Sequence, residues 1–213
     1  MQDIIIYGAG GLGREILFLI ENINTQKPEW NFLGFVDDGK PVGAPIGMKK
    51  IIGGGSWLAS IDKPVAVVMG FADSGAKASL YDKLSLNKNI FFPVIKHPTA
   101  LIASSSVLSE GVVVSAFCIV APDAKIKQGV FLNWYSSVGH DSVLGDFCSV
   151  MPSVNLSGGV TVGDRTLIGV GAKIHQNLKI GSDAVVGMGS IVLSNVPDRC
   201  TVLGNPAIII KKG

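Results

Sequence analysis

Residues 138–167 read VGHDSV LGDFCS VMPSVN LSGGVT VGDRTL, and each of these six-residue blocks begins with an aliphatic residue. The pattern runs without insertion from Ile102 to Pro197, so that sixteen consecutive blocks open with Ile, Leu or Val. The fifth residue of a block is small or β-branched in almost every case. A strict period of six matches neither a helix nor a simple alternation. It is typical of a parallel β-helix in which three short strands complete one triangular coil.

The chemistry of one block accounts for this period. We expect the fifth residue and the first residue of the next block to point inward, because successive side chains of a strand alternate. Positions two to four turn a corner, where we expect residues that tolerate unusual backbone angles. Glycine or asparagine is frequent there: at position two Gly139, Gly145, Gly163, Gly169, Gly181 and Gly187, and at position four Gly111, Gly129, Gly159, Gly171, Gly189, Asn177 and Asn195.

Length and composition favour two modest domains and argue against several classes of partner. A net charge of +2 over 213 residues favours neither nucleic acid nor a membrane surface. No run approaches the ~20 apolar residues of a membrane span, and Met1-Gln2-Asp3 lacks the basic start of a secretion signal. We therefore expect a cytoplasmic protein. Cys118 and Cys148 fall on inward fifth positions and are expected to be reduced core residues.

The first hundred residues alternate strands with helices, which predicts a small parallel α/β, Rossmann-like domain. We expect this domain over residues 1–97, and the β-helix with a C-terminal tail over 98–213. The expected strands are 4–7, 30–36, 65–70 and 90–95, and the expected helices are 14–23 and 77–84.

A glycine motif joins the first strand to the first helix. Gly8, Gly10 and Gly13 form G-x-G-x-x-G, and Asp37 follows at the distance of a ribose-binding acid. Such a turn lets a phosphate approach the backbone at a helix N-terminus. The domain is too short for a full dinucleotide fold, which favours a single nucleotide or nucleotide sugar. The alternative is a glycine turn used only for packing.

His140 and Asp141 occupy an outward corner of the coil. A histidine beside a carboxylate can act as a general base near neutral pH. The alternative is an exposed pair without function. A metal site is not favoured, because His97 lies outside the coil and no third ligand is evident.

Corner residues recur every eighteen positions and form three columns along the coil. Two columns are polar and one is apolar: Glu110, Gln128, Asp146, Asp164 and Ser182; Pro122, His140, Gly158, Gln176 and Ser194; and Ala116, Trp134, Pro152, Val170 and Met188. An outward apolar stripe calls for a second subunit or a long apolar ligand arm. A symmetric trimer would bring the His140 column of one subunit towards the apolar column of its neighbour.

Several motifs together carry a resemblance to a known family. They are YGAGGLG at 7–13, Asp37-Asp38, His97-Pro98, GHD at 139–141 within the unbroken coil, and VLGNPA at 202–207. Over essentially its whole length the chain resembles the hexapeptide-repeat sugar O-/N-acyltransferases, of the sialic acid O-acetyltransferase and UDP-4-amino-sugar N-acetyltransferase type. The resemblance implies a left-handed β-helix, a homotrimer with active sites between subunits, acetyl-CoA as acyl donor, and no metal.

The resemblance also implies roles for individual residues. His140 is the expected general base, and Asp141 is expected to increase its basicity. The expected contacts to the sugar nucleotide are Gly10, Gly11, Leu12, Asp37, Asp38 and Gly70, and those to acetyl-CoA are Ser149, Val170 and Met188. Leu12 and Ser149 depart from the family, because some relatives have histidine at both positions.

The predicted reaction is direct acetyl transfer from acetyl-CoA to the amine of a UDP-4-amino-4,6-dideoxy-sugar type of substrate. No covalent acyl-enzyme is expected, and a backbone N–H at a corner glycine is expected to steady the oxyanion. Alternatives are O-acetylation of sialic acid or a related sugar, a dinucleotide-binding oxidoreductase, and a non-catalytic scaffold. The nucleotide and the length of the acyl chain stay open.

Overall fold

The chain divides into two compact units, one from Met1 to Pro93 and one beginning at Val94. The computed structural model describes residues 1–212. The division lies before Val94, whereas the sequence pattern placed it after His97. The difference arises because Ile95–Lys96 already pairs in parallel with Val113 and Val114 of the β-helix.

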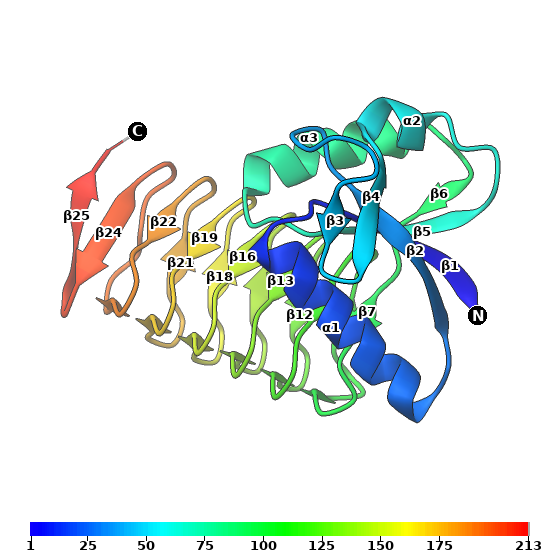
Figure 1. Ribbon diagram of the computed structural model, residues 1–213. Coiled ribbons are helices and arrows are strands. Elements are labelled where there is room, and N and C mark those ends of the chain that lie inside the picture. Colours follow the sequence, from blue (N-terminus) through cyan, green and yellow to red (C-terminus); the bar gives the residue numbers. More distant parts are fainter. Residues whose placement is uncertain (213) are drawn as a thin grey trace. The chain divides into compact units, whose positions relative to one another are not determined.

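The first unit is a six-stranded sheet in the order β3-β4-β2-β1-β5-β6, accompanied by three helices (Figure 1). Its neighbouring strands are parallel except for the antiparallel β3–β4 pair. The elements are β1 (Gln2–Tyr7), α1 (Gly11–Gln26), β2 (Trp30–Val36), β3 (Pro45–Ile46), β4 (Lys49–Gly53), α2 (Gly55–Ala59), β5 (Val65–Met69), α3 (Ser74–Leu84) and β6 (Ile90–Phe91). Because β2 and β5 flank β1, the order reverses there, which creates the switch point where ligands bind in open α/β sheets.

Three features of this unit differ from the expected pattern, and the first is the short helix α2, which was not predicted. The strand expected at 90–95 is interrupted, since β6 ends at Phe91 and Ile95 belongs to the β-helix. Pro93, which stands between them, has no N–H to donate to a ladder. The β3–β4 hairpin was not predicted, because its strands are short and Lys49 and Lys50 hide the apolar alternation.

The second unit is a parallel β-helix with three faces (Figure 1). The first face contains β7 (Ile95–Lys96), β10 (Val113–Val114), β13 (Phe131–Leu132), β16 (Ser149–Val150), β19 (Leu167–Ile168), β22 (Val185–Val186), β24 (Thr201–Gly204) and β25 (Ala207–Lys211). The second contains β8 (Leu101–Ile102), β11 (Ile119–Val120), β14 (Ser137–Val138), β17 (Asn155–Leu156), β20 (Lys173–Ile174) and β23 (Ile191–Val192). The third contains β9 (Val107–Leu108), β12 (Lys125–Ile126), β15 (Val143–Leu144), β18 (Thr161–Val162) and β21 (Lys179–Ile180).

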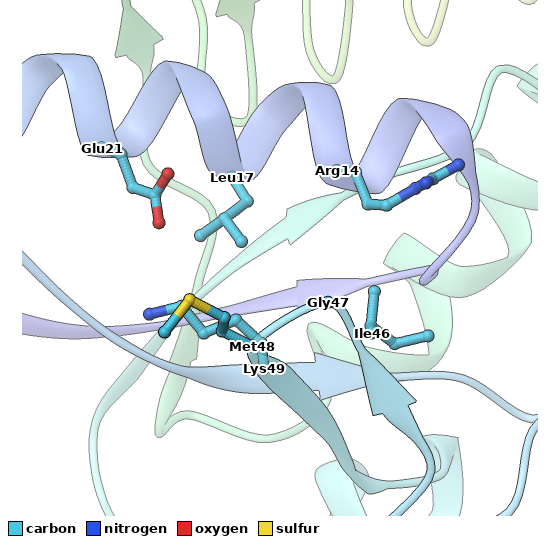
Figure 2. Close-up of a pocket in the computed structure, with 7 residues that line it drawn as sticks. All are labelled: Arg14, Leu17, Glu21, Ile46, Gly47, Met48 and Lys49. Atoms are coloured by element: carbon cyan, nitrogen blue, oxygen red, sulfur yellow. The ribbon is translucent and has the colours of Figure 1, made fainter.

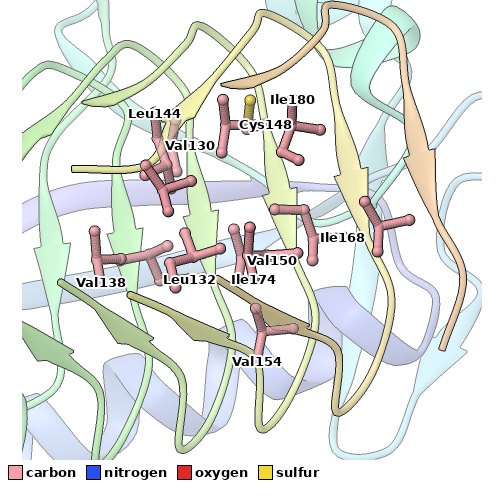
Figure 3. Close-up of a cluster of buried hydrophobic side chains, with 14 of the residues drawn as sticks. Val130, Leu132, Val138, Leu144, Cys148, Val150, Val154, Ile168, Ile174 and Ile180 are labelled. Atoms are coloured by element: carbon pink, nitrogen blue, oxygen red, sulfur yellow. The ribbon is translucent and has the colours of Figure 1, made fainter. Parts of the chain in front are cut away.

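The period of six sets the pairing of these strands. Val138, for example, pairs with Leu156, one coil of eighteen residues further along the chain. The last coil is shorter, because Ile180 pairs with Val196, and the antiparallel strand β25 follows on β24. Inside the coil, the aliphatic first residues from Val114 onward are all buried and stack with the small fifth residues in one cluster (Figure 3).

Positions four and two of the corner have different requirements. Position four has a positive φ in fourteen consecutive blocks from Gly111 to Gly189, which confirms the prediction of unusual backbone angles at this position. Asn195 lies in the shortened last coil and is not among these residues. The glycines at position two have no positive φ, so the expected role for them was wrong. They are needed because coils approach closely: a Cβ on Gly139 would lie 2.5 Å from the Gly158 nitrogen.

Candidate active site

His140 and Asp141 form a hydrogen-bonded pair at the corner between β14 and β15. The left-handed backbone of Asp141, with φ of 59°, turns its carboxylate back towards the ring. The His140 Nδ1 and Asp141 Oδ2 are 2.8 Å apart, and the two side chains are 69% and 66% exposed. Because a carboxylate only accepts, Nδ1 carries the proton and Nε2 is left as an acceptor. The pair can therefore take a proton at Nε2 while the carboxylate stabilises the resulting cation.

The acidic column of the coil is structural. The Asp164 carboxylate accepts a hydrogen bond from the Asp146 main-chain N–H at 2.9 Å, one coil earlier. The Ser182 N–H donates in the same way to Asp198, at 2.8 Å. From Asp146 onward, the polar side chains of this column thus cap main-chain N–H groups that the corner would otherwise leave without a partner. This column needs no ligand to account for its polarity.

The His140 column lacks this capping. Gly158, one coil on, has no side chain that could accept from His140, and Gln176 accepts nothing from Gly158. In the part of the chain that the structure describes, the main-chain N–H groups of His140 and Gly158 donate no hydrogen bond. Open N–H groups beside a potential base are the donors that an oxyanion requires.

The apolar column is exposed at Val170 and Met188, which are 47% and 73% accessible. Phe117 and Tyr135 lie beside the column at position four, with rings stacked at 5.1 Å and nearly parallel. The structure therefore places the predicted cofactor contacts Val170 and Met188 together on one outward stripe. Ser149 is not brought to this stripe, since it lies on β16 of the first face and is fully buried.

In the first unit, the glycine motif divides into packing glycines and open glycines. A Cβ on Gly13 would collide with the Gly8 carbonyl at 2.0 Å, and one on Gly70 would lie 2.7 Å from the Gly13 Cα. Gly13 and Gly70 are therefore glycine because β1, α1 and β5 approach closely, whereas Gly8 has a positive φ of 101°. A Cβ on Gly10 or Gly11 would meet nothing within 4 Å. Packing does not require glycine at these two positions, which leaves an open approach for a ligand at the start of α1, where Leu12 also lies.

Asp37 and Asp38 brace the turns at the carboxyl edge of the sheet. Asp37 accepts from the main-chain N–H of Ala9 at 2.9 Å, inside the glycine turn. Asp38 accepts from the N–H of Gly55 at 2.7 Å and from the Tyr7 hydroxyl. The bond from Tyr7, followed by that from Gly55, lowers the pKa of Asp38. Burial and this carboxylate together raise the pKa of Tyr7.

Sequence reasoning missed Tyr7, Gly55 and Arg14 at this edge. Arg14 lines a groove of about 470 Å³ between α1 and the β3–β4 hairpin, with Leu17, Glu21, Ile46, Gly47, Met48 and Lys49 (Figure 2). Its Nε also donates to the Gly10 carbonyl at 3.4 Å, which brings a cation to the glycine turn. The sequence signal for Arg14 was its position one helical turn after Gly10, because a helix N-terminus that begins with such a glycine turn can bind anions.

Neither a metal cluster nor a membrane-spanning helix is present in the chain as described. Over residues 1–212, no group of three His, Cys, Asp or Glu side chains is arranged to hold a metal. Within the same range, no helix is long and apolar enough to cross a bilayer. All three cysteines are unpaired with one another and buried.

Comparison with known proteins reveals similarity over the whole chain. Residues 3–84 match the PglD N-terminal domain family. The chain is 28% identical to the GDP-perosamine N-acetyltransferase of Escherichia coli O157:H7, and the match covers 97% of this chain and 96% of that protein. By contrast, it spans only 41% of the serine acetyltransferase of Synechococcus elongatus, to which it is 34% identical over 101 residues.

Two solved structures cover both units. The acetyltransferase domain of PglB from Neisseria gonorrhoeae FA1090 superposes with a TM-score of 0.89 at 25% identity, covering 99% of this chain and 100% of that one. PerB from Caulobacter crescentus, solved in complex with CoA and GDP-perosamine, superposes with a TM-score of 0.87 at 28% identity, covering 99% and 98%. These likenesses confirm the predicted fold class, an α/β unit followed by a left-handed parallel β-helix.

Proposed function

Because the chain belongs to the PglD-type hexapeptide-repeat sugar acetyltransferases, we propose that it transfers an acetyl group from acetyl-CoA to the amine of a nucleotide-linked amino sugar. One observation carries the proposal: the exposed His140 side chain holds its Nδ1–H against Asp141, which leaves Nε2 as a proton acceptor. The other polar column is occupied by structural hydrogen bonds, which leaves the His140 corner as the candidate for catalysis.

The proposed reaction is a direct transfer. The sugar nitrogen attacks the thioester carbonyl, and Nε2 of His140 takes the proton that the nitrogen loses. The C–N bond forms, the C–S bond breaks, and the proton passes from Nε2 to the departing CoA sulfur. The open N–H of Gly158 offers a donor for the oxyanion. The cysteines are buried and take no acyl group.

We assign the substrates to separate parts of the chain. The open turn at Gly10 and Gly11, with Leu12, Arg14 and Gly70 beside it, is proposed to receive the nucleotide diphosphate. Asp37 and Asp38 hold this edge in place and are proposed to contact the nucleotide. The Val170–Met188 stripe is proposed to bind the pantetheine arm of acetyl-CoA. Contact of Ser149 with acetyl-CoA would require its buried side chain to become accessible.

We further propose a homotrimer with its active sites between subunits. The second face of the coil, between the His140 corner and the apolar corner, exposes Leu101 and Ile119 beside a depression of about 370 Å³. Exposed aliphatic side chains beside an apolar stripe favour a neighbouring copy. Sedimentation equilibrium tests this assembly, and a monomer at assay concentration would contradict it.

Thiol release from acetyl-CoA tests the reaction. The panel contains UDP- and GDP-linked 4-amino-4,6-dideoxy sugars, the corresponding 4-hydroxy sugars, and free sialic acid. We expect release only with the amino sugars, and a loss of about 10²–10⁴-fold in turnover for His140→Ala with acetyl-CoA binding retained. Faster acetylation of sialic acid would replace this proposal with O-acetylation. Unchanged turnover of His140→Ala would remove that residue from the mechanism.

A further inference from the structure

Gly158 lies directly against the ring of His140. The two residues occupy the same corner position in successive coils, eighteen residues apart. A Cβ placed on Gly158 would be 2.4 Å from His140 Nε2, 2.5 Å from Cε1 and 3.0 Å from Cδ2. Carbon atoms in good contact are about 3.5–4.0 Å apart. A methyl group at this position would therefore overlap the edge of the imidazole that carries the proton-accepting nitrogen.

The backbone at Gly158 does not itself require glycine. Its φ is outside the left-handed region, whereas that of Gly159 is +68°. Gly158 is also the only glycine at position three of the sixteen blocks. If packing between coils or turn geometry required glycine at position three, other blocks would also have glycine there.

The main chain around Gly158 cannot give way to a side chain. The Gly158 carbonyl accepts from the Asn177 N–H at 3.0 Å, and the Gly159 N–H donates to the His140 carbonyl at 2.8 Å. These bonds hold the coil on both sides of the corner. The His140 side chain, in contrast, is largely exposed and can swing outward. An added methyl group would therefore displace the ring.

We infer that Gly158 is a positioning residue for His140: its lack of a side chain lets the imidazole lie against the next coil, with Nδ1 on Asp141 and the space at Nε2 open for the acceptor amine. The inference rests on the proposed function of His140 as the base. It assigns a steric role to the α-carbon of Gly158. This role is separate from any role of its N–H, which alanine retains.

The test is Gly158→Ala, with Gly158→Ser as a larger variant and Gln176→Ala as a control in the same column. We expect kcat to fall by about tenfold or more in Gly158→Ala and further in Gly158→Ser, because a small misplacement of a reacting group is costly. The KM for acetyl-CoA and the kinetics of Gln176→Ala should stay within about twofold of the unmodified chain. A Gly158→Ala enzyme with unchanged kcat would overturn the inference.

Two measurements on the protein without substrate separate positioning from general damage. Long-range ¹H–¹⁵N spectra should show His140 losing its Nδ1–H tautomer in Gly158→Ala, while His97 and His175 serve as internal references. Any loss of stability should disappear when the variant is made in a His140→Ala background. An equal loss in both backgrounds, or an unchanged tautomer, would overturn the inference. Both readouts remain valid even if His140→Ala retains turnover and the proposed function fails.

Discussion

Asp141→Asn separates the charge of the catalytic pair from its geometry. Asparagine keeps an oxygen that can accept from the His140 Nδ1–H, so the tautomer is retained and only the negative charge is lost. The experiment therefore measures how much that charge stabilises the imidazolium formed when Nε2 takes the proton.

The structure sets the size of this effect. At a separation of 2.8 Å, Coulomb's law with the dielectric constant of bulk water gives about 1.5 kcal/mol before salt screening and side-chain entropy are counted. Both side chains are about two-thirds exposed, and exposed pairs contribute about 0.2–1 kcal/mol in practice. We therefore expect kcat/KM to fall by about 1.4- to fivefold, and by less at high salt because the interaction is screened.

Steady-state thiol release at low and high ionic strength measures this loss. The matched control is Asp123→Asn, an exposed acid at the same corner position one coil earlier, with a φ of 62° and no histidine beside it. The control should be indistinguishable from the unmodified chain. A loss of more than about a hundredfold in Asp141→Asn would refute the reasoning, because the interaction of two solvent-exposed charges is too weak to produce an effect of that size.

Three further predictions concern the cofactor stripe, the coil ladder and the first unit. Met188→Glu should raise the KM for acetyl-CoA, because it puts a charge on an exposed apolar stripe. When Met188→Glu chains are mixed with His140→Ala chains, about a quarter of normal activity should return if the sites lie between subunits, and no activity should return if each chain holds its own site. Asp164→Ala should lower the free energy of unfolding by about 1–3 kcal/mol in a denaturant titration, because the Asp146 N–H one coil earlier loses its acceptor. Asp164→Asn keeps an oxygen acceptor and should unfold like the unmodified chain. Equal losses in the two variants would argue against this hydrogen bond between coils. The pKa of Asp38 is lowered in the fold, so its contribution to stability is complete above the ordinary value of 3.8 and is lost as pH falls through the lower folded pKa. Tyr7→Phe removes the hydrogen bond that is the largest cause of this lowering, so the denaturation midpoint of the variant should fall less steeply below pH about 4. An unchanged dependence on pH would count against the Tyr7–Asp38 bond.

Within the site, sequence reasoning reached the residues that stand next to one another in the chain. His140 and Asp141 were predicted from their place in one block. The spacing of the blocks also placed Val170 and Met188, eighteen residues apart, in one apolar column, while their contact with acetyl-CoA was implied by the family resemblance. The hydrogen bond between His140 and Asp141 was not predictable, because it depends on the left-handed angle that the corner imposes on Asp141. Gly158 was visible as a member of the column, but its contact with the ring depends on how closely two coils approach.

The six-residue period by itself determined that this chain forms a β-helix, because every block has the same local pattern of buried residues and strand alternation. It also determined that the corners form columns, since eighteen residues complete a coil. Tertiary structure alone decided which glycines serve packing and which leave room for a ligand: Gly13 meets Gly8 and Gly70 only when β1 and β5 are neighbours, whereas Gly10 faces open space. The same is true of the Asp38–Gly55 bond, which requires β4 beside β2. A periodic sequence specifies local conformation and burial, while contacts between distant segments depend on strand order and on the distance between neighbouring backbones.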